Sequence, residues 1–165
     1  MSHYYDECPD VKSNQQTIVY SYQHDKLQLV TDAGVFSKDK VDFGSDLLIQ
    51  TFLNEHPPGP SKSIVDVGCG YGPIGLTIAK VCPHHKVTML DVNQRALALA
   101  EKNSKHNQID NVIIKESDGL SAVKHNACDY ILTNPPIRAG KEVVHRIFAE
   151  AYDRLRTQGE LFVVI

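Results

Sequence analysis

The chain has 165 residues, of which 42% are hydrophobic, and it carries a formal net charge of −3 at pH 7. This length and apolar content predict a single domain with its own core. The mildly acidic balance excludes a strongly electropositive nucleic-acid binder, so any contact with RNA must be local. Because no apolar run approaches the roughly 18 residues that span a bilayer, and the polar start lacks signal-peptide character, we expect a soluble, cytoplasmic protein with no membrane partner.

Neither the cysteines nor the histidines are spaced as metal ligands. The cysteines are scattered without a Cys-x-x-Cys pair, which favours buried thiols in a reducing compartment over disulfides or a zinc site. They are Cys8, Cys69, Cys82 and Cys128. Among the eight histidines, His84 and His85 are adjacent and the others show no ligand spacing. The sequence therefore predicts no metal, and it leaves the oligomeric state open.

The first third of the chain predicts a hairpin, a loop and a helix. Two β-rich segments, Thr17 to Tyr22 and Lys26 to Thr31, flank a polar turn and should pair. The loop that follows mixes glycine, charged and apolar residues without a period, as in a plain connector or a lid. Apolar side chains at helical spacing then predict a helix from about Gly44 to Glu55, with Asp42 or Ser45 available as its cap.

The most informative stretch runs from Ile64 to Gly75, where a short apolar run and Asp66 precede a glycine-rich turn. It predicts a strand, a cofactor-binding loop and the start of a helix, because the backbone at Gly68, Gly70 and Gly72 can turn sharply and let a ligand approach. A carboxylate at Asp66 would repel a dinucleotide pyrophosphate but suit a cationic amino-acid group. This favours S-adenosylmethionine over NAD. The alternative is a turn that merely packs a helix onto the sheet.

Two further acids stand where an adenosine would need them. The strand from Lys86 to Leu90 ends at Asp91, where a carboxylate can accept hydrogen bonds from both ribose hydroxyls. The alternative is that Asp91 starts the next helix. Asp118 follows the strand from Val112 to Lys115 and is positioned to accept a hydrogen bond from an adenine amino group, although an Asp-Gly pair is also an ordinary turn.

The remaining elements complete an alternation of strands and helices. They are helices over Ile74 to Val81, Asn93 to His106 and Lys141 to Leu155, and strands over Asp129 to Thr133 and Glu160 to Ile165, with Gly159 ending the last connection. This alternation predicts an α/β fold with a Rossmann-like, doubly wound, mostly parallel sheet, helices on both faces and the ligand at the carboxyl ends of the strands. We divide the single domain, 1–165, into a hairpin and loop extension, 1–43, and a core, 44–165.

The fourth core strand runs directly into Asn134, Pro135 and Pro136. Consecutive prolines remove two backbone donors and fix φ, so the turn is rigid and presents carbonyl oxygens. The Asn134 side chain and the Pro135 carbonyl can together accept both hydrogens of a planar amine and orient its nitrogen. We therefore predict that these three residues are catalytic in amine methylation, which needs no metal. The alternative is that the turn only ends the strand.

Together these motifs resemble class I S-adenosylmethionine-dependent methyltransferases, in the branch with an Asn-Pro-Pro motif. More narrowly, the segments that start at Gly34, Val41, Val65 and Asn134 resemble the small-subunit ribosomal RNA guanine-N2 methyltransferase family. The resemblance implies that the target amine is held at the Asn-Pro-Pro turn, and that ribosomal RNA or the small ribosomal subunit is the partner. The predicted cofactor-binding residues are Phe36, Asp66, Gly68, Gly70, Gly72, Asp91, Asp118 and Asn134.

Two features depart from the family pattern. Ile137 stands where amine methyltransferases often carry an aromatic residue that stacks on the base, so stacking must come from elsewhere, such as Phe36 or Tyr71. The chain also ends inside or just after the fifth core strand, and we expect that C-terminal strands are missing. Cations beside the turn either hold phosphates or form a solvated helix face. The predicted substrate residues are Ile137, Arg138 and Lys141, and Arg146 is a further candidate.

The leading interpretation is an S-adenosylmethionine-dependent N-methyltransferase that acts on the exocyclic amine of guanine in small-subunit ribosomal RNA. Two alternatives stay open. One is methylation of a protein glutamine amide or a small-molecule amine, which the net charge of −3 suits better. The other is a non-catalytic cofactor-binding module. A dehydrogenase is disfavoured by Asp66 and by the Asn-Pro-Pro turn.

Overall fold

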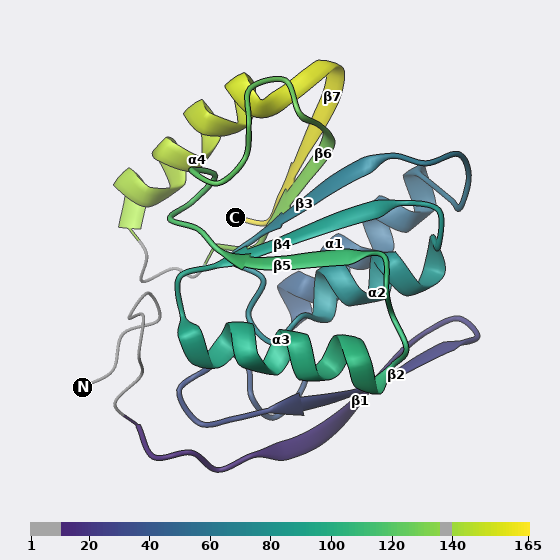
Figure 1. Cartoon of the computed structure of the whole chain (residues 1–165), viewed down its shortest axis with the longest axis vertical. Helices are drawn as coiled ribbons and strands as arrows, with labels where there is room; N and C mark the ends of the chain where they lie inside the picture. The colour runs from purple at the N-terminus through teal and green to yellow at the C-terminus, as the bar shows by residue number, and fades with distance from the viewer. Residues whose placement is uncertain (1–10, 136–139) are drawn as a thin grey trace.

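The computed structural model describes residues 11–135 and 140–165. In this part of the chain an antiparallel hairpin precedes alternating strands and helices (Figure 1). In chain order the elements are β1 Gln16–Tyr22, β2 Asp25–Thr31, α1 Phe43–Glu55, β3 Ser63–Val67, α2 Pro73–Val81, β4 Lys86–Asp91, α3 Gln94–His106, β5 Val112–Glu116, β6 Cys128–Thr133, α4 Gly140–Arg154 and β7 Leu155–Val163. No helix in these ranges is long and apolar enough to cross a membrane.

Five strands form a parallel sheet in the order β5-β4-β3-β6-β7. The chain moves outward from β3 through β4 to β5, and then crosses back to place β6 on the other side of β3. In open parallel sheets such a reversal leaves a crevice at the carboxyl ends of the strands, where ligands bind. The predicted Rossmann-like fold and the N-terminal hairpin are confirmed.

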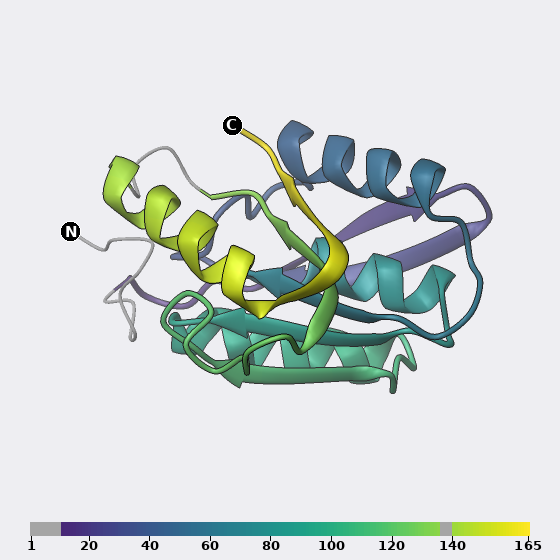
Figure 2. The ribbon, with the colours of Figure 1, turned by 90° about the horizontal axis from the view of Figure 1, so that it is seen from above.

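Helices cover both faces of the sheet, as the alternation predicted. The hairpin, α1, α2 and α3 share a large apolar cluster with one face, and α4 packs on the other through a smaller one. Figures 1 and 2 show α4 on one side of the sheet and α3 on the other. Strand β3 serves both clusters by alternation, since Ile64 faces the first and Val65 and Val67 face the second.

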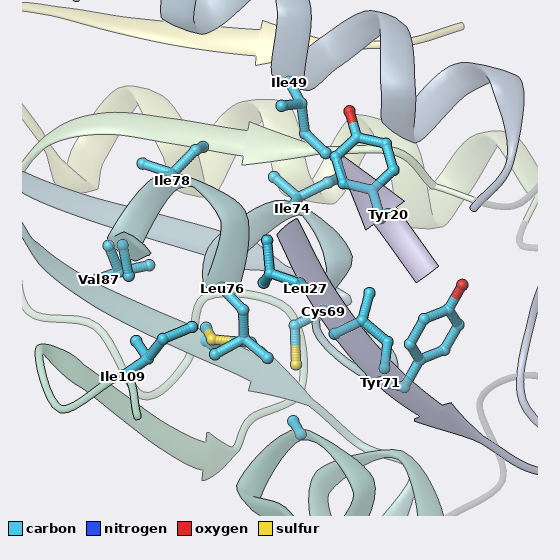
Figure 3. Close-up of a cluster of buried hydrophobic side chains, with 14 of the residues drawn as sticks. Tyr20, Leu27, Ile49, Cys69, Tyr71, Ile74, Leu76, Ile78, Val87 and Ile109 are labelled. Carbon is cyan, nitrogen blue, oxygen red and sulfur yellow. The ribbon is translucent and has the colours of Figure 1, made fainter. Parts of the chain in front are cut away.

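The hairpin is part of the core. Leu27 and Leu29 alternate along β2 and are fully buried. Strand β2 contacts α2 and α3, and Leu27 lies near Leu76 of α2 in the same cluster (Figure 3). Burying such side chains stabilises the packing by about 1.5–3 kcal/mol each. The loop between β2 and α1 is therefore held against the core at its start. The division of the chain at residue 43 stays a prediction.

The last strand differs from the prediction. A loop ended by Gly159 was expected before a strand from Glu160, but β7 follows α4 directly at Leu155 and contains Gly159. The pairing with β6 shifts register between Cys128 and Tyr130, so the irregularity is absorbed within the strand. A Cβ at Gly159 would lie 2.9 Å from the carbonyl oxygens of Arg156 and Asp129. This glycine permits close backbone approach rather than ending a loop.

Candidate active site

Two adjoining hollows lie at the carboxyl edge of the sheet. The first hollow, about 390 Å³ including space open to solvent, lies where β3, β4 and β6 end beside α4. It is lined by Val67, Gly68, Asp91, Val92, Ser117, Gly119, Thr133, Asn134, Pro135, Val143, Arg146 and Ile147.

The second hollow, about 350 Å³ on the same measure, lies between the glycine-rich loop and the segment that leads into α1. It is lined by Phe36, Asp42, Ser45, Gly68, Cys69, Gly70, Tyr71, Pro73, Ile74 and Asn134. Gly68 and Asn134 line both hollows. A ligand bound in one hollow can therefore meet a ligand in the other at these two residues.

The glycine-rich loop turns between β3 and α2 with a left-handed backbone at Gly68, Gly70 and Gly72, and the last two have different surroundings. Gly70 has a φ of 58° and nothing within 4 Å of where its Cβ would be, so it leaves open space on the second hollow. Gly72 has a φ of 110° and caps α2, and its Cβ would lie 2.6 Å from Cδ1 of Leu76. Gly70 thus leaves room for a ligand, whereas Gly72 is packed against Leu76. The predicted cofactor contacts of both glycines stay predictions.

Asp91 ends β4 and is only 3% exposed, yet it lines the first hollow. Its carboxylate accepts hydrogen bonds from the Gly70 backbone N–H at 2.8 Å and the Asn93 backbone N–H at 2.9 Å. Burial raises its pKa, and these hydrogen bonds oppose that rise. The cap of α3 is Asn93, whose side chain accepts from the Ala96 N–H at 3.0 Å. The helix start therefore does not account for Asp91.

Asp66 is the fourth residue of β3, two positions before Gly68, and it lines neither hollow. It is 1% exposed, and its Oδ2 accepts from the Gly75 N–H at 2.9 Å, which ties β3 to α2. Its Oδ1 has no hydrogen-bond partner among the described residues. Burial, together with the nearby Asp91 charge, raises the pKa of Asp66 to about 7. A direct cofactor contact by Asp66 stays a prediction.

Asp118 and Arg146 form an exposed ion pair at the rim of the first hollow. The two guanidinium nitrogens of Arg146 donate to the Asp118 carboxylate at 2.5 and 3.2 Å, and Nε lies 4.0 Å from Glu150. Arg146 lines the hollow, as does Gly119 next to Asp118. The predicted contact of Asp118 with an adenine amino group stays a prediction. Its carboxylate is held by Arg146 of α4 at the rim of the first hollow.

Asn134 follows β6 and is gripped by the segment that starts α1. Its Nδ2 donates to Oδ2 of Asp42 at 2.8 Å and to Oγ of Ser45 at 3.1 Å. Asp42 is also the cap of α1, and it accepts from the Ser45 N–H at 3.1 Å. In the sequence, Asp42 and Ser45 stand out only as alternative caps of α1. Their contact with Asn134 could not be predicted, because no local pattern signals a partner about 90 residues away.

The aromatic residues near the second hollow differ in exposure. Phe36 lines it and is 45% exposed, and Phe43, the first residue of α1, is 80% exposed. Tyr71 is buried, and its hydroxyl donates to the Ser37 carbonyl at 3.0 Å, so its ring is not presented for stacking. Lys141 is exposed at the start of α4. Three predicted residues, Pro136, Ile137 and Arg138, lie outside the described residues.

One group of metal-ligand side chains comes together in the described ranges, away from both hollows. One atom each of Glu55, His56 and Glu160 lies within 4.8 Å of the others. The His56 ring is already engaged, with Nε2 2.9 Å from Glu160 and Nδ1 3.2 Å from the Tyr130 hydroxyl. The ion pair accounts for this group.

With this geometry established, comparison with known proteins identifies the class. The family model described as the methyltransferase small domain matches residues 26–165. The chain belongs to this family. The predicted class, a class I S-adenosylmethionine-dependent methyltransferase, is confirmed, and with it the predicted cofactor.

Named relatives are similar along most of the chain. Protein YbxB of Bacillus subtilis, described as uncharacterized, is 48% identical over 164 residues, which cover 99% of this chain and 80% of YbxB. The ribosomal RNA small subunit methyltransferase C of Vibrio cholerae is 31% identical over 94% of this chain and 45% of its own length. The ribosomal RNA large subunit methyltransferase G of Pseudoalteromonas translucida is 34% identical over 80% of this chain and 36% of its own length.

A solved structure of the T. thermophilus 16S rRNA N2 G1207 methyltransferase, RsmC, in complex with AdoMet and guanosine superposes with a TM-score of 0.82. Its sequence is 26% identical, and the match covers 94% of this chain and 43% of RsmC. The chain thus spans less than half of each relative that is named as an rRNA methyltransferase.

The described residues fit S-adenosylmethionine. The space beside Gly70 allows a ligand to approach the backbone, and the Asp91 carboxylate faces the first hollow with lone pairs to spare for hydroxyl donors. The cofactor supplies a methyl group on a positively charged sulfur, and Asp91 and the loop glycines would hold its adenosine side. Asn134 stands at the junction of the two hollows, since it lines both.

Proposed function

We propose that this chain transfers the methyl group of S-adenosylmethionine to the exocyclic amine of guanine in small-subunit ribosomal RNA. The observation that carries the proposal is the orientation of Asn134, whose amide N–H groups are taken by Asp42 and Ser45 while the residue lines both hollows. Its carbonyl oxygen is then available for an amine. The small-subunit and guanine assignments draw on the names of Vibrio cholerae methyltransferase C and T. thermophilus RsmC.

In this proposal the amine enters the second hollow and donates its hydrogens to Oδ1 of Asn134 and to the Pro135 carbonyl. Both are acceptors without competing N–H groups on the substrate side. They orient the nitrogen lone pair and stabilise the positive charge that develops on nitrogen during transfer. The extra proton of the methylated amine leaves to water. No side chain has to act as a strong base.

An RNA base must leave its stack for its amine to reach this depth. Phe36 and Phe43 are exposed aromatic rings beside the second hollow, and base–aromatic stacking contributes about 1–3 kcal/mol per base. In this proposal the two rings provide the stacking that Ile137, which is not aromatic, cannot. The exposed cation Lys141 at the start of α4 would contact phosphate, and the same role is predicted for Arg138.

The test uses tritiated S-adenosylmethionine with isolated small subunits, large subunits, the deproteinised RNA of each, and a total protein extract. We expect label in small-subunit RNA, recovered as N2-methylguanosine after digestion to nucleosides. Asn134→Ala should lower kcat about 100-fold or more while the cofactor Kd stays within about threefold. The control Asn107→Ala removes an amide outside both hollows and should keep kcat. Label in protein or in large-subunit RNA would overturn the substrate assignment.

A further inference from the structure

We propose that Asp42 and Ser45 are positioning residues for Asn134: they fix its amide so that Oδ1 faces the methyl acceptor, and the Asp42 carboxylate polarises that amide. This inference deepens the proposed function and rests on it. It assigns a role in the reaction to the N-terminal segment that leads into α1. Neither the glycine-rich loop nor the Asn-Pro-Pro turn contains these residues.

The partners of the Asn134 amide determine which way it points. An ionised carboxylate can only accept hydrogen bonds, so the group that Asn134 presents to Oδ2 of Asp42, 2.8 Å away, must be its NH₂. The Ser45 Oγ, 3.1 Å from the same nitrogen, accepts as well. The two amide hydrogens are thereby used. The carbonyl oxygen lies on the opposite side of a planar group, and none of the described residues donates a hydrogen bond to it.

The Asn134 amide is also held tightly by the start of α1. A Cβ built on Gly44 would lie 3.1 Å from both Nδ2 and Oδ1 of Asn134, which is tighter than an ordinary van der Waals contact. The first turn of α1 therefore lies against the amide, between the two residues that bond to it. Asp42 is itself fixed, since the same Oδ2 accepts from the Ser45 N–H as the helix cap. Two hydrogen bonds and the close approach of Gly44 together leave the Asn134 amide little freedom to rotate.

The negative charge of Asp42 favours the positive charge that develops on the target nitrogen. In the transfer a nitrogen–carbon bond forms and the carbon–sulfur bond breaks, with its electron pair going to sulfur. The positive charge moves from sulfur to the nitrogen, which then releases a proton to water. A carboxylate bonded to the far side of the amide increases the negative charge on Oδ1, as hydrogen bonds in a chain polarise one another. Oδ1 then binds the developing cation more strongly than the neutral amine, which is the requirement for catalysis.

Substitutions separate orientation from charge. Asp42→Ala removes both, and we expect kcat to fall about 10- to 100-fold with the cofactor Kd within twofold. Asp42→Asn keeps a carbonyl oxygen for the Ser45 N–H and for Asn134, and asparagine caps helices as well as aspartate. It should keep the fold and lower kcat by about 3- to 10-fold through the lost charge alone. Ser45→Ala removes one neutral hydrogen bond and should lower kcat about two- to fivefold.

The matched control is Asp46→Asn, which removes a carboxylate from the same first turn of α1. Asp46 accepts from the Tyr20 hydroxyl at 2.6 Å and makes no hydrogen bond to Asn134. We expect its kcat to equal that of the wild type, although its melting temperature falls. If Asp46→Asn lowers kcat as much as Asp42→Asn does, or if Asp42→Ala keeps wild-type kcat, the positioning role is wrong.

A second readout does not depend on methyl transfer. In ¹⁵N-labelled protein the side-chain amide protons of Asn134, assigned by their loss in Asn134→Ala, should move upfield in Asp42→Ala and stay in place in Asp46→Asn. Unchanged Asn134 amide resonances in Asp42→Ala would overturn the inference. If wild-type protein methylates no RNA, the proposed function fails, and the resonances alone then decide whether Asp42 holds Asn134.

Discussion

The two hollows share an edge but are built in different ways. The first is made from the ends of neighbouring parallel strands, with Asp91 as the last residue of β4 and Ser117 directly after β5. The second is made half from the glycine-rich loop and half from Phe36, Asp42 and Ser45, which precede the core sheet in sequence. In the proposed function the first hollow takes the cofactor, so that side of the site is a property of the sheet. The second hollow takes the methyl acceptor, and that side depends on how the N-terminal segment is docked.

That docking has a specific anchor. Asn103 of α3 is fully buried, and its Oδ1 accepts from the Val30 N–H at 2.7 Å while its Nδ2 donates to the carbonyls of Val30 at 3.0 Å and Tyr71 at 2.9 Å. One side chain thus joins the hairpin, a helix of the core and the glycine-rich loop. The Tyr71 hydroxyl continues the link to Ser37. The extension is therefore fixed to the glycine-rich loop.

The largest expected effect comes from breaking the first hollow alone. Asp91→Ala removes the acceptor predicted for the ribose hydroxyls and leaves two backbone N–H groups, of Gly70 and Asn93, without their partner. Because hydrogen bonds to charged groups contribute about 1.5–3 kcal/mol each, we expect affinity for S-adenosylmethionine to fall at least about 100-fold. Calorimetric titration with S-adenosylmethionine, S-adenosylhomocysteine and NADH measures this. Glu116→Ala, an exposed acid nearby, should keep affinity; equal losses in both variants would contradict the ribose role.

Removing the Asn103 side chain, which joins the hairpin to α3 and the glycine-rich loop, should act mainly on stability. Asn103→Ala leaves buried backbone groups of Val30 and Tyr71 unpaired, so we expect unfolding free energy to drop by about 3 kcal/mol. The matched control is Asn107→Ala, since Asn107 bonds the same helix to Gln28 through an amide in a more exposed place. It should cost about 1 kcal/mol. Urea unfolding separates the two, and equal losses would mean that burial beside the glycine-rich loop adds nothing.

The buried acid under the loop predicts a pH dependence of stability. The pKa of Asp66 is raised from its ordinary 3.8 to about 7, first by burial and then by the Asp91 charge. Between these values the folded protein keeps a proton that the unfolded chain has released. Stability from this group is therefore greatest below about pH 4 and is lost as pH rises through about 7, by a few kcal/mol at most. Burial also raises the pKa of Asp91, which changes stability with pH in the same direction.

Unfolding free energies measured from pH 4 to pH 8.5 test this. We expect the wild type to lose stability across the range and Asp66→Asn to show a shallower slope. Asp110→Asn, a change at an exposed acid, serves as the control and should follow the wild type. A slope in Asp66→Asn as steep as that of the wild type would assign the pH dependence to other groups.

The contrast between the hollows also explains what sequence could and could not predict. The strands, helices and Asp91 were predictable, because apolar periodicity and the order of strands determine where residues at strand ends meet. The contacts of Asn134 with Asp42 and Ser45 join positions about 90 residues apart and depend on the docked hairpin. The irregular β7 was missed because the close backbone approach at Gly159 has no signature beyond the glycine itself. Tyr71 was considered for stacking, and only packing shows that its ring is buried.

The smallest expected effects come from the rim of the first hollow, where Arg146 of α4 contacts Asp118. The pair between Asp118 and Arg146 is exposed, so breaking it should change stability by less than about 1 kcal/mol. If Asp118 accepts the adenine amino group, Asp118→Ala should weaken S-adenosylmethionine about three- to tenfold, and should have no effect on an analogue with hydrogen in place of that amino group. Arg146→Ala breaks the pair but keeps the carboxylate, so its affinity should match or exceed the wild type. Equal weakening of both ligands would show that Asp118 supports only the shape of the rim and makes no hydrogen bond to the adenine amino group.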